Sequence, residues 1–206
     1  MRLLLGLLTI SLLGGCHSRF KKHVGSIDHV RADMPSFGGP VVNLGQLDDD
    51  SLLGAAVNIG QAIQSQDLTG KINGAVRPDD VQANFVLGLD DALGKRPFDV
   101  RDKSRHTLQI EMLHYGIDVP GLGQPGALTY VLRTELYKGS GKKVYKATHH
   151  CALPFAEFDS VSVVLGTVDN AKAIREMKRK ELRALFDEGA AICAERVAVR
   201  IRKHGG

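Results

Sequence analysis

The feature that most restricts the fold is a set of three stretches in which apolar residues alternate with polar ones. The stretches cover residues 108–117, 128–136 and 144–151. Successive side chains of a strand point to opposite faces, so this period of two indicates strands that each bury one face. No helical pattern lies between the stretches, and Gly-Ser-Gly at 139–141 is a hairpin turn signal. We therefore expect an antiparallel meander of three to four strands, with a further short strand near 98–100.

Helical periodicity flanks these strands on both sides. Apolar residues spaced three and four apart predict a helix over about 50–65, and Pro78 opens a second helix that ends near Gly94. Residues 67–77 carry glycine and polar groups and are expected to form a loop. A long helical pattern runs from about 170 to 203. Helices packed on one face of an antiparallel sheet give a two-layer α+β domain with a long C-terminal helix, which is the fold class we expect.

The composition fits a single globular domain and argues against some binding functions. The chain has 206 residues, of which 43% are apolar and 24% are charged. A chain of this size can bury its own core. Aromatic residues make up 5% and tryptophan is absent, which weakens any function based on stacking of bases. The formal charge of +4 is a small excess, and we expect no nucleic-acid partner.

The start of the chain has the organisation of an export signal. Arg2 supplies a positive charge, and an apolar stretch over residues 3–13 follows it. This stretch is too short to span a bilayer, which needs about 20 apolar residues. A buried N-terminal helix is the alternative, although nothing caps such a helix and Gly14-Gly15 end it abruptly. The sequence therefore predicts a signal peptide over residues 1–15.

The residues Leu13-Gly14-Gly15-Cys16 resemble the lipobox of bacterial lipoproteins. The resemblance implies that the Cys16 thiol receives a diacylglycerol, that a peptidase cuts before this residue, and that the new amino group is acylated, for example with palmitate. Two or three acyl chains give lasting attachment to a membrane. His17 stands where an Asp is the usual inner-membrane retention signal of enteric bacteria. We therefore expect the outer membrane, facing the periplasm, rather than the inner membrane.

The predicted mature chain divides into a tether and a domain. Residues 16–47 are mixed polar with Gly and Pro, and we interpret them as the lipidated N-terminus and a flexible tether. Residues 48–206 are expected to form a single periplasmic α+β domain. The acidic run at 48–50 lacks the spaced oxygen ligands of a calcium loop, so we interpret it as a helix cap.

Lipidation of Cys16 would leave two further cysteines, Cys151 and Cys193. An exported protein reaches an oxidising compartment, in which disulfides form and persist. We therefore expect a disulfide between Cys151 and Cys193. Two buried free thiols are the alternative, because cysteine also behaves as a small apolar residue.

Few residues point to catalysis, to a cofactor or to a metal. Residues 121–126 match G-x-G-x-x-G, but strands on both sides replace the helix that a dinucleotide site needs, so we expect a loop. His149 and Cys151 share a face of their strand, and two ligands are too few for zinc unless a reduced Cys193 joins them. We therefore expect no metal, no cofactor and no catalytic residue. A hydrolase would need a base, and the sheet region offers these candidates: His106, His114, His149 and His150.

The order of the elements, with Gly141-Lys142-Lys143-Val144-Tyr145 at the last hairpin, looks like that of small periplasmic domains of auxiliary outer-membrane lipoproteins. That group includes curli-secretion-like, peptidoglycan-synthase-activator-like and lipid-transport-auxiliary lipoproteins. We expect a membrane-anchored, non-catalytic assembly, transport-auxiliary or scaffolding component with an envelope protein as its partner. A lipoprotein that holds a lipid or a small hydrophobic molecule is the alternative, and it would need an apolar pocket of several hundred cubic ångströms, at least about 300 Å³. An envelope hydrolase is the third possibility.

Overall fold

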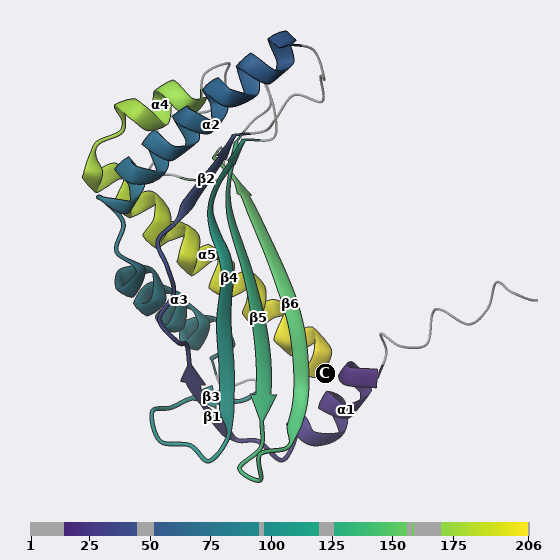
Figure 1. Cartoon of the computed structure of the whole chain (residues 1–206). Helices are drawn as coiled ribbons and strands as arrows, with labels where there is room; N and C mark the ends of the chain where they lie inside the picture. The colour runs from purple at the N-terminus through teal and green to yellow at the C-terminus, as the bar shows by residue number, and fades with distance from the viewer. Residues whose placement is uncertain are drawn as a thin grey trace, which may run out of the picture.

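A computed structural model describes residues 15–44, 52–94, 97–119, 126–155, 158 and 170–205 of the chain. Within that part, a curved sheet lies in front of helices that cross behind it, as Figure 1 shows. The prediction of a mixed helix-and-sheet fold with a long C-terminal helix is confirmed. The sheet, however, has more strands than predicted, and some of them pair in parallel.

The three long predicted strands do form an antiparallel meander. β4 covers Thr107–Val119, β5 covers Ala127–Tyr137 and β6 covers Lys143–Pro154. β5 lies between the other two and pairs with both in antiparallel register. Every second residue of β5 from Leu128 to Leu136 is buried, because these side chains face the helices. The alternation in the sequence therefore reflects one covered and one uncovered face.

Three shorter strands widen this meander into a mixed sheet of six strands. β1 is His29–Asp33, β2 is Val41–Leu44 and β3 is Asp99–Val100. β1 and β2 both pair with β4 in parallel, and β3 pairs with β1. The expected antiparallel meander of three to four strands is thus wrong in strand number and in strand direction. Strands this short, paired in parallel, show no clear alternation of their own.

Most of the segment interpreted as a flexible tether, residues 16–47, is part of the folded domain. It contributes β1, β2 and the helix α1, Gly15–Val24, which contacts β6 and the C-terminal helix. Phe20 of α1 is fully buried, with its ring centre 4.6 Å from that of Tyr145. The tether interpretation is wrong here because most of the apolar residues of this segment are buried in the core of the domain. The domain consequently begins well before residue 48.

Helix α2, Leu52–Asn73, is longer than the sequence suggests. It continues through residues 67–73, which the glycine and polar content predicts as a loop. Leu68 and Ile72 lie one helical turn apart and are both fully buried. Tertiary packing of this apolar pair outweighs the weak local propensity.

The remaining helices begin and end close to the expected positions. α3 covers Pro78–Leu93, which confirms the helix predicted to open at this proline. The long C-terminal pattern is divided into α4, Asn170–Glu176, and α5, Arg179–Gly205. At the break the Lys178 N–H donates to Glu181 Oε2 at 2.8 Å, which caps the first turn of α5.

Close approach of backbones sets the spacing between the layers. A Cβ atom at Gly189 of α5 would lie 2.3 Å from Leu128 Cδ2 and 3.1 Å from the Tyr130 hydroxyl. Gly189 is therefore explained by contact with β5, and α5 continues through it without a break. A Cβ atom at Gly88 of α3 would lie 3.1 Å from the Cα atom of Ala191. Two glycines thus allow α5 to pack tightly between the sheet and α3.

The disulfide expected between Cys151 and Cys193 is present and joins β6 to α5. The two Cα atoms are 5.7 Å apart, in the usual range for a disulfide. The two residues are 42 positions apart in the sequence, and closing a loop of that length contributes about 4 kcal/mol in the chain-entropy model. The bond fixes an edge strand of the sheet to the helix that crosses it.

The pairing of β2 with β4 requires glycine at position 116. A Cβ atom at Gly116 would lie 1.8 Å from the carbonyl oxygen of Val41. We expect Gly116→Ala to displace β2 and to lower the free energy of unfolding by about 1–3 kcal/mol, as measured by chemical denaturation. Gly70→Ala is the matched control, because Gly70 lies in α2 with open space around its Cβ position. The control should be neutral or raise stability by about 0.5–1 kcal/mol, and equal losses in both variants would contradict the argument.

Candidate functional site

The pairing of β4 is interrupted along the edge that faces β1 and β2. Pairing with β1 ends at Asp33 opposite Gln109, and pairing with β2 starts at Val41 opposite Gly116. Between these two ladders, residues 110–115 of β4 have no strand beside them on this edge within the described chain. The sheet therefore has an internal opening at which backbone groups of β4 are left without a neighbouring strand.

A β-bulge lies opposite the same opening. β4 and β5 shift register between Met112 and His114, which leaves Leu113 as the extra residue. The alternation changes phase there, since Ile110 and Tyr115 are both buried although they are five positions apart. Bulges commonly redirect side chains at functional sites. Here the bulge leaves Leu113 41% exposed.

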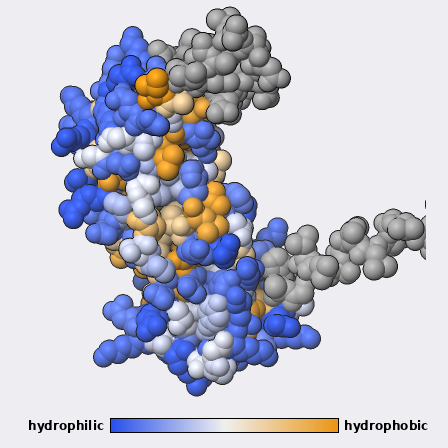
Figure 2. All heavy atoms as spheres, viewed as in Figure 1, coloured by the Kyte–Doolittle hydropathy of each residue, from blue (hydrophilic) through white to orange (hydrophobic). Residues whose placement is uncertain are grey.

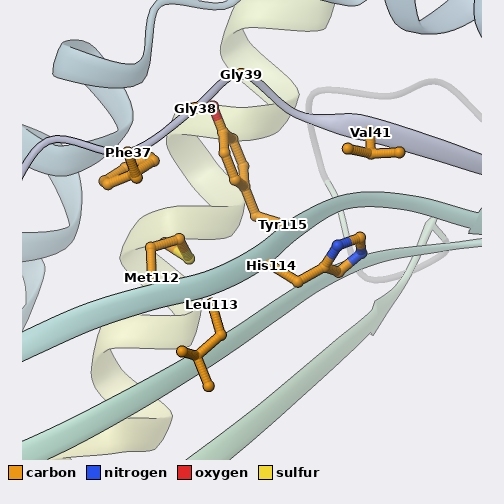
Figure 3. Close-up of a pocket in the computed structure, with 8 residues that line it drawn as sticks. All are labelled: Phe37, Gly38, Gly39, Val41, Met112, Leu113, His114 and Tyr115. Atoms are coloured by element: carbon orange, nitrogen blue, oxygen red, sulfur yellow. The ribbon is translucent and has the colours of Figure 1, made fainter.

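A small cavity lies between the opening and the connection from β1 to β2. Its volume is about 160 Å³, and Figure 3 shows the residues that line it: Phe37, Gly38, Gly39, Val41, Met112, Leu113, His114 and Tyr115. The ring of Tyr115 points from β4 towards the two glycines of the connection. The cavity is smaller than the pockets of about 300–1,000 Å³ that hold small-molecule ligands. It is large enough for one side chain of a partner.

Tyr115 forms the buried wall of this site. Its ring contacts three others, Phe37 edge-on at 5.3 Å, Tyr130 stacked at 6.0 Å and Phe186 edge-on at 6.0 Å between ring centres. Burial raises the pKa of the Tyr115 hydroxyl, so the group stays protonated. Within the described part of the chain, this buried hydroxyl has no hydrogen-bond partner. The Tyr130 hydroxyl, by contrast, donates to the Phe186 carbonyl at 2.7 Å.

Exposed apolar side chains also gather on the uncovered face of the sheet. Val41 is 45% exposed and Leu113 is 41% exposed, and both line the same cavity. Figure 2 shows apolar residues grouped in the middle of this face, among hydrophilic surroundings. An apolar group next to an unpaired length of strand can take up a protein segment by contact and by backbone hydrogen bonds.

His149, one of the candidate bases, is a buried structural residue. It is 1% exposed, and its Nε2 atom lies 2.8 Å from Thr134 Oγ1. Burial, together with the positive charges of Arg200, His204 and His150, lowers the pKa of His149 to about 4. The ring is therefore neutral near pH 7. It lies beneath α5 and not at the cavity, so the geometry gives it no substrate to act on.

The other candidate bases lie apart from one another. His106 is buried at the start of β4, where the Gly139 N–H donates to its Nδ1 atom at 3.2 Å. His114 lines the cavity at the bulge, and His150 is exposed on the uncovered face. The structure thus does not gather the four histidines. It instead brings His204 close enough to lower the pKa of His149, a proximity that depends on the packing of α5 on β6 and has no local signal in the sequence.

The structure gives no support to a metal site at 149–151. Cys151 is oxidised in its disulfide, so its sulfur does not serve as a thiolate ligand. In the described residues, no group of three or more His, Cys, Asp or Glu side chains is arranged to hold a metal ion. Residues 48–50 and most of the loop at 121–126 lie outside the described residues, as do residues 1–14. Among the described helices, none has the length and apolar content to cross a membrane.

A second cavity opens at the far end of the sheet from the bulge. It has a volume of about 610 Å³, and the residues that line it are polar or charged: His29, Arg31, Asp102, Lys103, Ser104 and Arg105. The expected alternative function, binding of a lipid or small hydrophobic molecule, needs a large apolar cavity. Of these two cavities among the described residues, the larger is lined by polar and charged residues and the one at the bulge is small.

The two stacked tyrosines offer a test of the site. Tyr115→Phe removes a buried hydroxyl without a partner, so we expect the free energy of unfolding to rise by about 1 kcal/mol. Tyr130→Phe is the matched control and should lower stability by about 1 kcal/mol, because it removes the hydrogen bond to Phe186. Chemical denaturation measures both. A loss in Tyr115→Phe as large as that in the control would show that the Tyr115 hydroxyl is paired.

Comparisons with known proteins give a weak structural likeness. No protein-family model matches the chain, and no curated protein matches its sequence. The crystal structure of protein XCC0632 from Xanthomonas campestris, described under the family model DUF330, aligns with a TM-score of 0.40 and 18% sequence identity. The alignment covers 62% of this chain and 62% of that one, so the chain spans about 62% of the length of the solved structure. A likeness of this degree assigns neither a family nor a function to the protein.

Proposed function

We propose that the protein is a lipoprotein of the bacterial envelope, anchored through Cys16, that acts as a non-catalytic assembly, transport-auxiliary or scaffolding component. Its partner is an envelope protein that docks at the bulge of β4. The outer membrane, with the domain facing the periplasm, is the proposed location. The observation that carries the docking proposal is the coincidence of exposed Leu113 with the interrupted edge of β4.

Two features support docking of a protein segment rather than a small ligand. The cavity of about 160 Å³ fits one side chain and is too small for a lipid. The stretch of β4 at 110–115 offers backbone groups to a segment that lies along it. Extended segments bind to sheets by placing an apolar side chain in a pocket and by pairing their backbone with a strand edge that has no neighbouring strand.

Two features support the envelope location. The lipobox resemblance at Cys16 implies export and a lipid anchor. The disulfide between Cys151 and Cys193 is of the kind that persists in an oxidising compartment and is rare in the cytosol. Both features support the location of the protein and not the identity of its partner.

Mass spectrometry of the protein purified from its native membrane tests the anchor. We expect the chain to start at Cys16 and to carry a diacylglycerol on sulfur and an acyl group on nitrogen. Cys16→Ser is the control and should carry no lipid and retain its leader. A wild-type chain that starts at Met1, or that has a free Cys16 thiol, would overturn the proposed anchoring.

A photo-crosslinking amino acid at position 113 tests the docking site. We expect one discrete adduct in living cells, because Leu113 lies at the rim of the proposed site. The same substitution at Leu87 is the matched control, since Leu87 is a 63% exposed leucine on α3 rather than on the sheet. Gly116→Ala should reduce the adduct at 113, because it displaces β2. An equal adduct at both positions, or none at 113, would contradict the proposal.

A further inference from the structure

Positive side chains gather at the end of the domain that holds α1 and the hairpin between β5 and β6. We name this surface the basic end. It combines three segments that are far apart in sequence: α1, the hairpin and the loop that precedes β4. Figure 1 places all three at the lower end of the molecule, and Figure 2 shows mainly hydrophilic residues there. Its cations are Arg19, Lys22, Lys103, Arg105, Lys138 and Lys142, and Arg31 of β1 lines a cavity with Lys103 and Arg105.

The hairpin is fixed between the other two segments. On one side Lys138 Nζ donates to Ser26 Oγ, just after α1, at 3.1 Å. On the other side the Gly139 N–H donates to His106 Nδ1 at 3.2 Å. A Cβ atom at Gly139 would also lie only 3.0 Å from the Cβ of Arg105. The three segments that carry the cations are therefore held against one another at this end of the domain.

Several positive charges around α1 act on the imidazole of His23. Partial desolvation lowers the pKa of His23, and the positive charges of Lys138, Lys142, Arg19 and Lys22 lower it further. Cations from a helix and from a hairpin more than a hundred residues away thus lie close enough to act on one group. Like charges held together in this way cost stability unless an anion balances them.

The positive surface continues on the other side of the hairpin. The cavity of about 610 Å³ there is lined by Arg31, Lys103 and Arg105, with Asp102 as the acid of its lining. Nearby, Glu135 is already engaged, because it pairs with Lys143 at 2.5 Å and with Lys146 at 3.3 Å. Most cations of the basic end are exposed, and Lys138 is half-buried.

The proposed lipid anchor lies within one helical turn of this surface. Cys16 belongs to α1 and precedes Arg19 of the basic end by three residues, a rise of about 4.5 Å along the helix. Since α1 packs on the domain, a lipid on Cys16 would hold the domain directly against the bilayer. A long tether, by contrast, would let the domain turn freely.

We propose that the basic end rests on the headgroups of anionic phospholipids, so that it and the lipid on Cys16 attach the domain to the membrane together. This inference rests on the proposed anchoring at Cys16. Basic side chains near an anionic surface contribute about 1 kcal/mol each. Combining acyl chains with a basic patch gives firmer attachment than either alone. The contact also fixes which end of the sheet faces the membrane.

Vesicle binding of the unlipidated mature chain tests the surface by itself. The chain would run from residue 16 to residue 206 with Cys16→Ser, and would be mixed with vesicles of phosphatidylcholine alone or of phosphatidylcholine with phosphatidylglycerol. We expect binding to the second kind only, weakened by high salt. Lys22→Glu with Lys142→Glu should weaken it by at least about tenfold.

The matched control makes the same change of charge elsewhere. Lys180→Glu with Arg183→Glu alters two exposed residues near the opposite end of α5 and should leave vesicle binding unchanged. Thermal unfolding of both double variants checks that each is folded. Equal losses in the two variants, or equal binding to both kinds of vesicle, or no binding at all, would overturn the proposal. The lipid on Cys16 is measured separately by mass spectrometry, so failure of the anchor and failure of the basic end give different results.

Discussion

The pairing of β4 is the constraint on which the rest of the structure depends. This strand pairs with β5 along one edge and with two separate short strands along the other. The extra residue at Leu113 changes the phase of the strand, so that side chains on both sides of the bulge reach the helices. The opening between β1 and β2, the cavity and the exposed leucine all lie at that phase change. The candidate site is thus a consequence of how one strand is shared among three neighbours.

The sequence predicts correctly those helices and strands in which buried residues recur at a regular spacing. β5 has an alternation that is visible in the sequence, and α3 has a proline start with an apolar stripe, so both are predicted correctly. The disulfide follows from the count of cysteines and the predicted export. β1 and β2 are missed because four or five residues in parallel pairing give no periodic signal. One signal was present, since a glycine within a strand, here Gly116, often marks close approach of another backbone.

The site itself is less predictable than the fold around it. His114 is a candidate residue of the sequence, and the structure places it at the cavity, but beside apolar groups instead of a catalytic partner. Leu113 and Tyr115 carry no recognisable motif, and their roles arise from a register shift that only the paired strands define. The basic end is likewise assembled from three distant segments. Charge in each segment is visible in the sequence, whereas their proximity depends on contacts such as that between Lys138 and Ser26.

The disulfide makes the stability of the domain depend on the redox state of its surroundings. On the proposed route of export, Cys151 and Cys193 would first be thiols in a reducing compartment, and the chain would lack about 4 kcal/mol of its final stability. Net stabilities of single domains are about 5–15 kcal/mol, so this is a large share. A precursor weakened by that amount is easier to keep unfolded for passage through a membrane. Formation of the disulfide in the oxidising compartment would then stabilise the folded domain. The covalent link between β6 and α5 would therefore oppose unfolding and return of the exported chain.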